Sequence, residues 1–138
     1  MTFLNFINRY PSLRQFFSFA LVGVVGLIAD AGVLSLMTRA VGLDPFSGRI
    51  VSFLAAVTVT WALNRHFTFR GLGKGSLIRQ WTKFCLANLS GFAANFATYT
   101  ACVAFIPLCH AIPELALIPA SLVGLIFNYT ASKHLVFR

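Results

Sequence analysis

The sequence predicts an all-α integral membrane protein, in which four transmembrane helices form a duplicated two-helix hairpin and both termini face the cytoplasm. Three observations support this fold class. Apolar residues make up 58% of the chain and charged residues 10%, whereas charged residues form roughly 25% of a soluble domain. The cations lie between long apolar runs, and the two halves of the chain resemble each other. We expect one domain over residues 1–138.

Four segments are apolar enough to cross a hydrocarbon core, which takes about 20 helical residues. In chain order, the expected spans are residues 16–38, 47–66, 81–106 and 113–132. The first is interpreted as a retained span, because its apolar stretch is longer than that of a signal peptide and no small-residue cleavage site follows it. Gly and Pro mark the three short connections as loops.

The distribution of Lys and Arg predicts the orientation. Nine of the eleven cations fall at the termini and in the central connection, and only Arg39 and Arg49 flank the first connection. By the positive-inside rule, both termini and the central loop face the cytoplasm. Anionic lipid headgroups are the expected partner of the net charge of +8, and nucleic acid is not, because the cations cluster between apolar runs.

The two halves share a sequence pattern. RQFFSF begins at Arg14 and RQWTKF begins at Arg79, and the ending RHFTFR of the second span matches KHLVFR of the fourth. We interpret the chain as a duplicated hairpin, with repeats over about residues 14–70 and 79–138. Each repeat has an even number of spans, so both enter the membrane in the same direction, as in parallel-repeat transporters.

Small and polar residues recur four apart and mark the expected packing face, where helices approach closely and hydrogen-bond to each other. They are Ser52, Ala56, Thr60 and Asn64 in the second span, and Ala120, Gly124, Asn128 and Ser132 in the fourth. Asp30 lies well inside the first span, and a carboxylate there is a functional candidate by default. The structural alternatives are a partner for Arg49, near the outer end of the second span, or a protonated residue that forms hydrogen bonds.

No cofactor, metal site or catalytic group is expected, so the chain is not predicted to be an enzyme. Cys85, Cys102 and Cys109 show no C-x-x-C spacing, and the three histidines form no ligand pattern. No nucleophile or pair of carboxylates stands at catalytic spacing.

The whole chain resembles the GtrA-like family of small four-span membrane proteins. The resemblance depends on FALVGVVGLIAD in the first span, NRHFTF after the second and SKHLVF at the end. It implies a multi-pass protein of the bacterial inner membrane that flips a polyprenyl-phosphate-linked sugar for cell-surface polysaccharide synthesis or modification. It also implies a separately encoded glycosyltransferase as partner. We expect a homo-oligomer, with a dimer favoured, because four short helices bury little area.

This resemblance assigns the two parts of the substrate to different residues. Cations at the cytoplasmic ends of the spans are expected to bind the phosphate: Arg65, Lys133, Arg14 and Arg79. Polar and aromatic side chains within the spans are expected to bind the sugar: Asp30, Asn95, Thr60, Asn128, Asn64, Trp61 and Tyr129.

Two other functions fit the sequence. A membrane-anchoring accessory subunit of a polyprenyl-phosphate glycosyltransferase has no feature that separates it clearly from a flippase. A small proton-coupled multidrug-type exporter also carries a carboxylate in its first span, but such exporters lack the duplicated hairpin with basic and aromatic ends.

The charge distribution makes a testable prediction about orientation. A reporter fused after Arg138 is expected to be cytoplasmic, and a tag inserted in CHAIP, residues 109–113, is expected to be periplasmic. Reporter activity and protease access in intact cells measure both positions. A periplasmic reporter after Arg138 contradicts the topology and the parallel repeat together.

Overall fold

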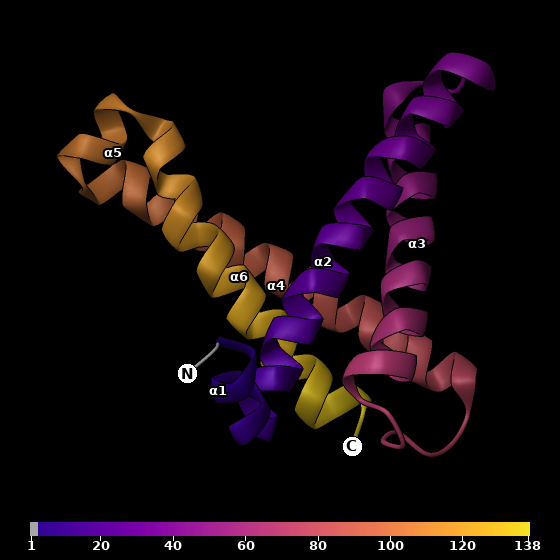
Figure 1. The fold of residues 1–138 in the computed structure, drawn as a ribbon. Helices are drawn as coiled ribbons and strands as arrows, with labels where there is room; N and C mark the ends of the chain where they lie inside the picture. The colour runs from indigo at the N-terminus through magenta and orange to yellow at the C-terminus, as the bar shows by residue number, and fades with distance from the viewer. Residues whose placement is uncertain (1–2) are drawn as a thin grey trace. The chain divides into compact units, whose positions relative to one another are not determined.

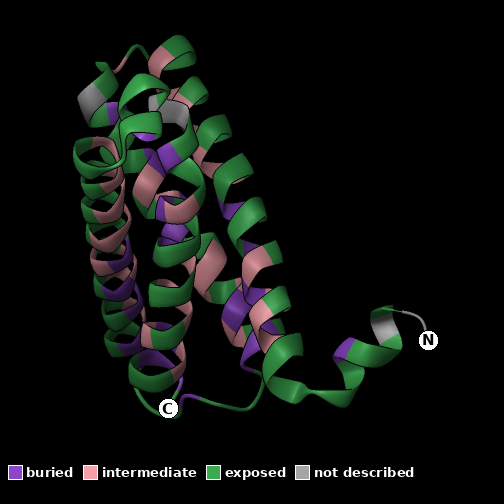
Figure 2. Ribbon diagram, turned by 90° about the vertical axis from the view of Figure 1, so that its left-hand side faces the viewer, coloured by how far each residue is buried: buried purple, intermediate pink, exposed green. Residues whose placement is uncertain are grey.

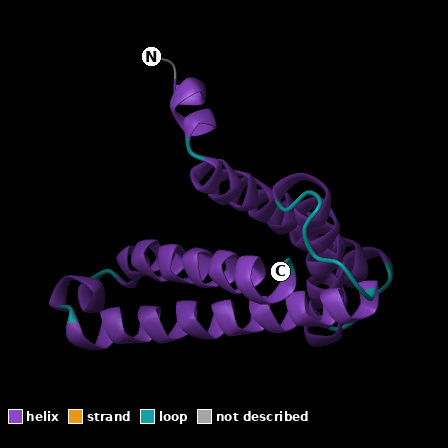
Figure 3. Cartoon of the chain, turned by 90° about the horizontal axis from the view of Figure 1, so that it is seen from below, coloured by secondary structure: helices purple, strands orange, loops and turns teal. Residues whose placement is uncertain are grey.

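The computed structural model describes residues 3–138, which are helical with short connecting loops (Figure 1). Over that range no strand is present (Figure 3). The chain divides into two compact units, Met1–Lys74 and Gly75–Arg138. In each unit, two long helices run side by side and form a hairpin.

Unit 1 is built on the long helices α2 and α3. Pro11 begins α2. Its fixed φ angle suits the first turn, and its missing N–H costs nothing there, because the first N–H groups of a helix have no acceptor within the helix. The backbone N–H of Ser47 donates to the Asp44 carboxylate, 3.0 Å away, and so caps the start of α3. In chain order the elements are α1 (Phe3–Arg9), α2 (Pro11–Ser35), η1 (Leu36–Ala40), α3 (Pro45–Leu63) and η2 (Asn64–Thr68).

Unit 2 is built on α4 and α6. The long helix α4 ends before Pro107, because the residue preceding a proline is disfavoured in a helix. Short helical turns then lead into α6. In chain order the elements are α4 (Leu77–Phe105), α5 (Pro107–Ala111), η3 (Pro113–Ala116), α6 (Leu117–Ala131) and η4 (Ser132–Val136).

Each of the four expected spans falls on helical structure, although the ends differ. The first long helix begins at Pro11, five residues earlier than expected, and α6 begins at Leu117 because a 3₁₀ turn occupies Pro113–Ala116. Among the described residues, one continuous helix, Pro11–Ala40, combines the length (30 residues) and the hydropathy (2.2) needed to cross a membrane. The count of four spans stays a prediction.

Glycines bring the two long helices of each unit close together. A Cβ atom added to Gly26 of α2 would overlap the Thr60 methyl group of α3, and one added to Gly91 of α4 would overlap the Asn128 side chain of α6. A Cβ on Gly124 of α6 would lie 3.3 Å from the backbone oxygen of Gly91. This close approach is typical of helix pairs in membranes.

The outer surface of both hairpins is apolar. On each of the four long helices exposed residues outnumber buried ones, and the buried residues gather in short patches (Figure 2). On α2, the exposed fractions of Leu21, Leu27 and Ile28 are 67%, 68% and 69%, whereas Gly26 beside them is buried. Small residues inside and large apolar residues outside suit a hydrocarbon surrounding, in which lipid tails solvate the outer side chains.

The glycine contact in unit 1 predicts a selective loss of stability. Gly26→Ala is expected to lower the free energy of unfolding in detergent by about 1–3 kcal/mol, because the added methyl group meets Thr60 in a closely packed contact. Gly23→Ala, on the same helix, is the matched control, since nothing lies within 4 Å of its added Cβ. Equal losses in the two variants, measured by thermal or denaturant unfolding, would contradict the close contact.

Candidate functional site

The second long helix of each unit ends in a widened, π-helical turn. In η2 the backbone N–H of Phe69 donates to the Asn64 carbonyl at 2.8 Å, and in η4 that of Phe137 donates to the Ser132 carbonyl at 2.9 Å. The two closing residues have similar backbone angles, φ −115° and ψ 42° for Phe69 and φ −103° and ψ 43° for Phe137. Such π-helical turns occur often at functional sites.

A buried pair of aromatic rings holds each π-helical turn against the first helix of its unit. Phe69 contacts Phe19 of α2 with ring centroids 6.2 Å apart and an angle of 66° between the planes. Phe137 contacts Phe84 of α4 at 6.0 Å and 67°. Edge-to-face pairs of this kind are favourable contacts. Since the exposed fractions of Phe69 and Phe137 are 0% and 1%, the rings fix the position of each turn.

The predicted phosphate ligands lie at these ends. Arg65 is in η2, is half-buried, and donates from Nη1 to the Gly73 carbonyl at 3.3 Å. Lys133 is in η4, is half-buried, and places Nζ 5.6 Å from the centre of the Tyr129 ring, a cation–π distance. Arg14 and Arg79 are exposed in the first turns of α2 and α4. Each unit therefore carries two of the four cations.

The buried polar residues of η2 form a hydrogen-bonded chain. Thr68 Oγ1 donates to Asn64 Oδ1 at 2.8 Å and lies 2.8 Å from Ser18 Oγ of α2. Asn64, a predicted sugar ligand, is thus buried and bonded within unit 1. In unit 2, 68 residues after Asn64, Ser132 is fully buried, and its hydroxyl has no hydrogen-bond partner among the described residues.

The predicted sugar ligands in the middle of the helices lie at the glycine contacts. Thr60 donates to the carbonyls of Ala56 and Val57 at 2.9 and 3.1 Å, and its methyl group faces Gly26. In unit 2, Asn128 lies over Gly91 and Asn95 lies against Gly124. The side-chain oxygen of Asn128, Oδ1, is buried, and no group of the described residues donates a hydrogen bond to it. The aromatic candidates Trp61 and Tyr129 are half-buried.

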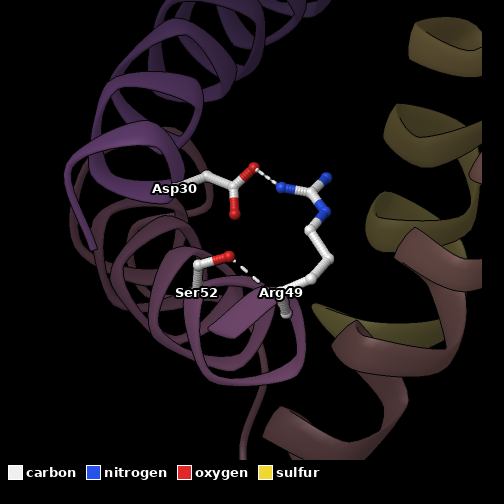
Figure 4. A network of polar contacts seen from close by, with 3 residues as sticks. All are labelled: Asp30, Arg49 and Ser52. Atoms are coloured by element: carbon white, nitrogen blue, oxygen red, sulfur yellow. Dashed lines mark hydrogen bonds and ion pairs between the residues drawn. The ribbon is translucent and has the colours of Figure 1, made fainter. Parts of the chain in front are cut away.

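Asp30 forms an ion pair across the first hairpin. Arg49 Nη1, from the start of α3, donates to Asp30 Oδ2, and the Ser52 hydroxyl donates to the Arg49 carbonyl at 3.1 Å (Figure 4). The side chain of Asp30 is 14% exposed and that of Arg49 is 58% exposed. The second carboxylate oxygen, Asp30 Oδ1, is buried without a hydrogen-bond partner among the described residues. Arg49, which the sequence suggested as a structural partner of Asp30, therefore contacts it.

The family of the chain follows from one comparison. A family model described as the GtrA/DPMS transmembrane domain matches residues 18–137. The chain belongs to this family. It is therefore a membrane protein, and the family connects it with polyprenyl-phosphate sugar pathways. No curated protein matches the chain.

The match to the GtrA/DPMS domain covers both aromatic pairs, both π-helical turns and all but one of the candidate residues. Only Arg14 precedes the matched range. Over residues 3–138, no group of three or more His, Cys, Asp or Glu side chains is arranged to hold a metal ion.

The sequence did not predict the side-chain contacts that hold the π-helical turns against the first helix of each unit. Ser18 and Thr68 stand 50 residues apart in the chain and share no motif, so only the packing of α2 on η2 brings them together. The aromatic pairs had a signal, because Phe19 and Phe84 each lie five residues after the matching Arg-Gln starts. The alignment of the two halves on those starts makes Phe19 and Phe84 equivalent positions, and that equivalence is the signal from which a repeated ring contact follows.

The hydrogen-bonded chain in unit 1 predicts the cost of removing one hydroxyl. Thr68→Val preserves shape but leaves the buried Asn64 oxygen without its donor, so the free energy of unfolding is expected to fall by about 1–3 kcal/mol. Thr58→Val is the control, because Thr58 is exposed and donates to Leu54 O of its own helix. If the two variants unfold alike in detergent, the buried hydrogen bonds of Thr68 contribute nothing specific to stability.

Proposed function

We propose that this member of the GtrA/DPMS family flips a polyprenyl-phosphate-linked sugar across the bacterial inner membrane for cell-surface polysaccharide synthesis or modification. One observation carries the proposal: the second long helix of each unit ends in a π-helical turn that contains a cation and is closed by a phenylalanine of a buried aromatic pair. A lipid-linked sugar has a phosphate at the headgroup level, a hydroxyl-rich sugar and an apolar tail. Its transport requires cations at the membrane surface and polar groups within the helices.

The architecture that we propose is a duplicated hairpin with four spans and both termini in the cytoplasm. Support comes from features that recur at fixed separations in the two units. The ring contact of Phe19 with Phe69 has a counterpart in Phe84 with Phe137, and the contact of Gly26 with Thr60 has one in Gly91 with Asn128. A parallel repeat of this kind presents equivalent groups at the same membrane face.

Arg65 and Lys133 are the central phosphate ligands in this proposal, assisted by Arg14 and Arg79. A guanidinium group offers several donors in a plane and an ammonium group offers a compact positive charge, so both recognise phosphate. Arg65 uses one of its donors on the Gly73 carbonyl, which holds the side chain in place. The Tyr129 ring orients Lys133 in the same way.

The sugar ligands in this proposal are the polar and aromatic groups of the hairpins. Asp30 Oδ1 and Asn128 Oδ1 are buried acceptors without partners among the described residues, and an unpaired buried acceptor is costly until a donor reaches it. Sugar hydroxyls are such donors. Trp61 and Tyr129 supply flat rings for the apolar face of a sugar, and Thr60, Asn64 and Asn95 complete the set.

A second candidate is a membrane-anchoring subunit of a glycosyltransferase, acting beside or instead of transport. The observation that favours it is the family description, which groups GtrA with DPMS. Both functions imply a separately encoded glycosyltransferase that uses polyprenyl phosphate. For either function we propose a homo-oligomer, most simply a dimer, in which more apolar surface is buried than in one chain.

The phosphate assignment predicts a loss of transport on removing cations. Arg65→Ala and Lys133→Ala are each expected to slow flipping of a labelled polyprenyl-phosphate sugar by about tenfold, the effect of losing one charge-assisted hydrogen bond. The assay is performed in vesicles containing purified protein. The amount of protein inserted is measured in parallel, because these two residues also contribute to orientation.

Arg70→Ala is the matched control, since Arg70 is exposed beside the same turn and outside the proposed site. If the double variant of Arg65 and Lys133 flips the sugar as fast as the native protein, these cations serve orientation alone. If the native protein flips nothing but increases the activity of a co-reconstituted glycosyltransferase, the accessory subunit replaces the flippase.

A further inference from the structure

The ion pair of unit 1 has no charged counterpart in unit 2. By the separations that align the hairpins, Asp30 corresponds to Asn95 and Arg49 corresponds to Leu117. Both charges are therefore absent together, although the close helix contacts are present in both units. The chain contains a charged and a neutral version of one arrangement, and the amide of Asn95 occupies the place of the carboxylate.

The two partners of the ion pair have unequal surroundings. The Asp30 side chain is 14% exposed, whereas the Arg49 side chain is 58% exposed and lies near the start of α3. A buried carboxylate without a cation is strongly unfavourable, but an exposed guanidinium group at a helix end reaches water or headgroups. Loss of Arg49 should therefore do more harm than loss of the Asp30 charge.

The carboxylate of Asp30 divides its two oxygens between different tasks. Oδ2 accepts the hydrogen bond from Arg49, and Oδ1 is buried without a partner among the described residues (Figure 4). An asparagine at this position retains an acceptor oxygen and loses the charge. In unit 2 this is the residue present, and no cation accompanies it.

We infer that residue 30 accepts a hydrogen bond from a sugar hydroxyl and does not need its negative charge to do so, and that Arg49 is a positioning residue that balances the Asp30 charge and leaves Oδ1 open. The inference rests on the proposed function for the identity of the donor. It assigns Arg49 a place in the site that the sequence did not predict, and it makes a carboxylate at residue 30 dispensable when Arg49 is removed with it.

The test compares single and double variants that copy unit 2. The variants are Arg49→Leu, Asp30→Asn, the double variant Asp30→Asn with Arg49→Leu, and the double variant Asp30→Ala with Arg49→Leu. Arg39→Leu is the control, because Arg39 is an exposed cation of the same hairpin, outside the ion pair. The two readouts are the folded fraction after extraction in detergent and the flipping of a labelled polyprenyl-phosphate sugar in vesicles.

Arg49→Leu alone is expected to lower both the folded fraction and flipping, by about tenfold, because the Asp30 charge is left buried. Arg49→Lys should restore much of the loss. Asp30→Asn alone should slow flipping by about threefold, less than Arg49→Leu does, because the amide keeps an acceptor oxygen. Adding Asp30→Asn to Arg49→Leu should bring both readouts back to the level of Asp30→Asn.

The double variant Asp30→Ala with Arg49→Leu distinguishes the role of residue 30 as a hydrogen-bond acceptor from the balance of charge between residues 30 and 49. It should fold like the double variant with asparagine but flip about tenfold more slowly, because residue 30 no longer offers an acceptor. Equal flipping by the two double variants would overturn the acceptor role and leave a purely structural ion pair. Flipping that requires a pH gradient and is abolished by Asp30→Asn would show that the charge or proton of Asp30 is needed, and would overturn the inference.

The folded fraction keeps this inference separate from the proposed function. If the native protein flips no labelled sugar, the proposed function and the sugar acceptor both fail. The claim that Arg49 balances the Asp30 charge is then tested by the folded fraction alone. If the double variant Asp30→Asn with Arg49→Leu is as poorly folded as Arg49→Leu, that claim is overturned.

Discussion

Close contact between two helices in surroundings that supply no hydrogen bonds is the constraint on which both hairpins depend. Lipid tails are as apolar as leucine, so burial of leucine does not draw the helices together. The contact is made instead at Gly26 and Gly91, where a small residue admits Thr60 or Asn128 from the facing helix. The polar side chains proposed as sugar ligands at these contacts therefore lie on the same faces that hold each hairpin closed.

The two units solve the same packing problem with different chemistry. Unit 1 has a hydrogen-bonded chain from Ser18 through Thr68 to Asn64 and an ion pair at Asp30. In unit 2, Ser132 and Asn128 keep buried oxygens without partners among the described residues. Buried polar atoms without partners are rare in folded proteins and call for an explanation. Among the described residues, unit 1 keeps one such atom, Asp30 Oδ1, and unit 2 keeps two.

The sequence predicted the helices and the family correctly, and it proposed the candidate site only as a collection of separate residues. Apolar length and cation position are local properties of the chain, which is why the helical regions and the GtrA-like resemblance were accessible. The ion pair was foreseen as one of the alternatives for Asp30, because Arg49 lies near the outer end of the second expected span. The unpaired Oδ1 atom and the chain through Thr68 depend on side-chain orientation across two helices, and sequence spacing does not encode that.

The aromatic pairs also have a consequence for synthesis. Phe19 meets its partner Phe69 fifty residues later, so the first hairpin can close while the rest of the chain is still being made. Phe84 must wait for Phe137, the penultimate residue of the sequence. Since the chain is made from its N-terminus, the second hairpin closes after the first, and its glycine contacts stay accessible until Phe137 has been made. The order of closure follows from where two phenylalanines stand.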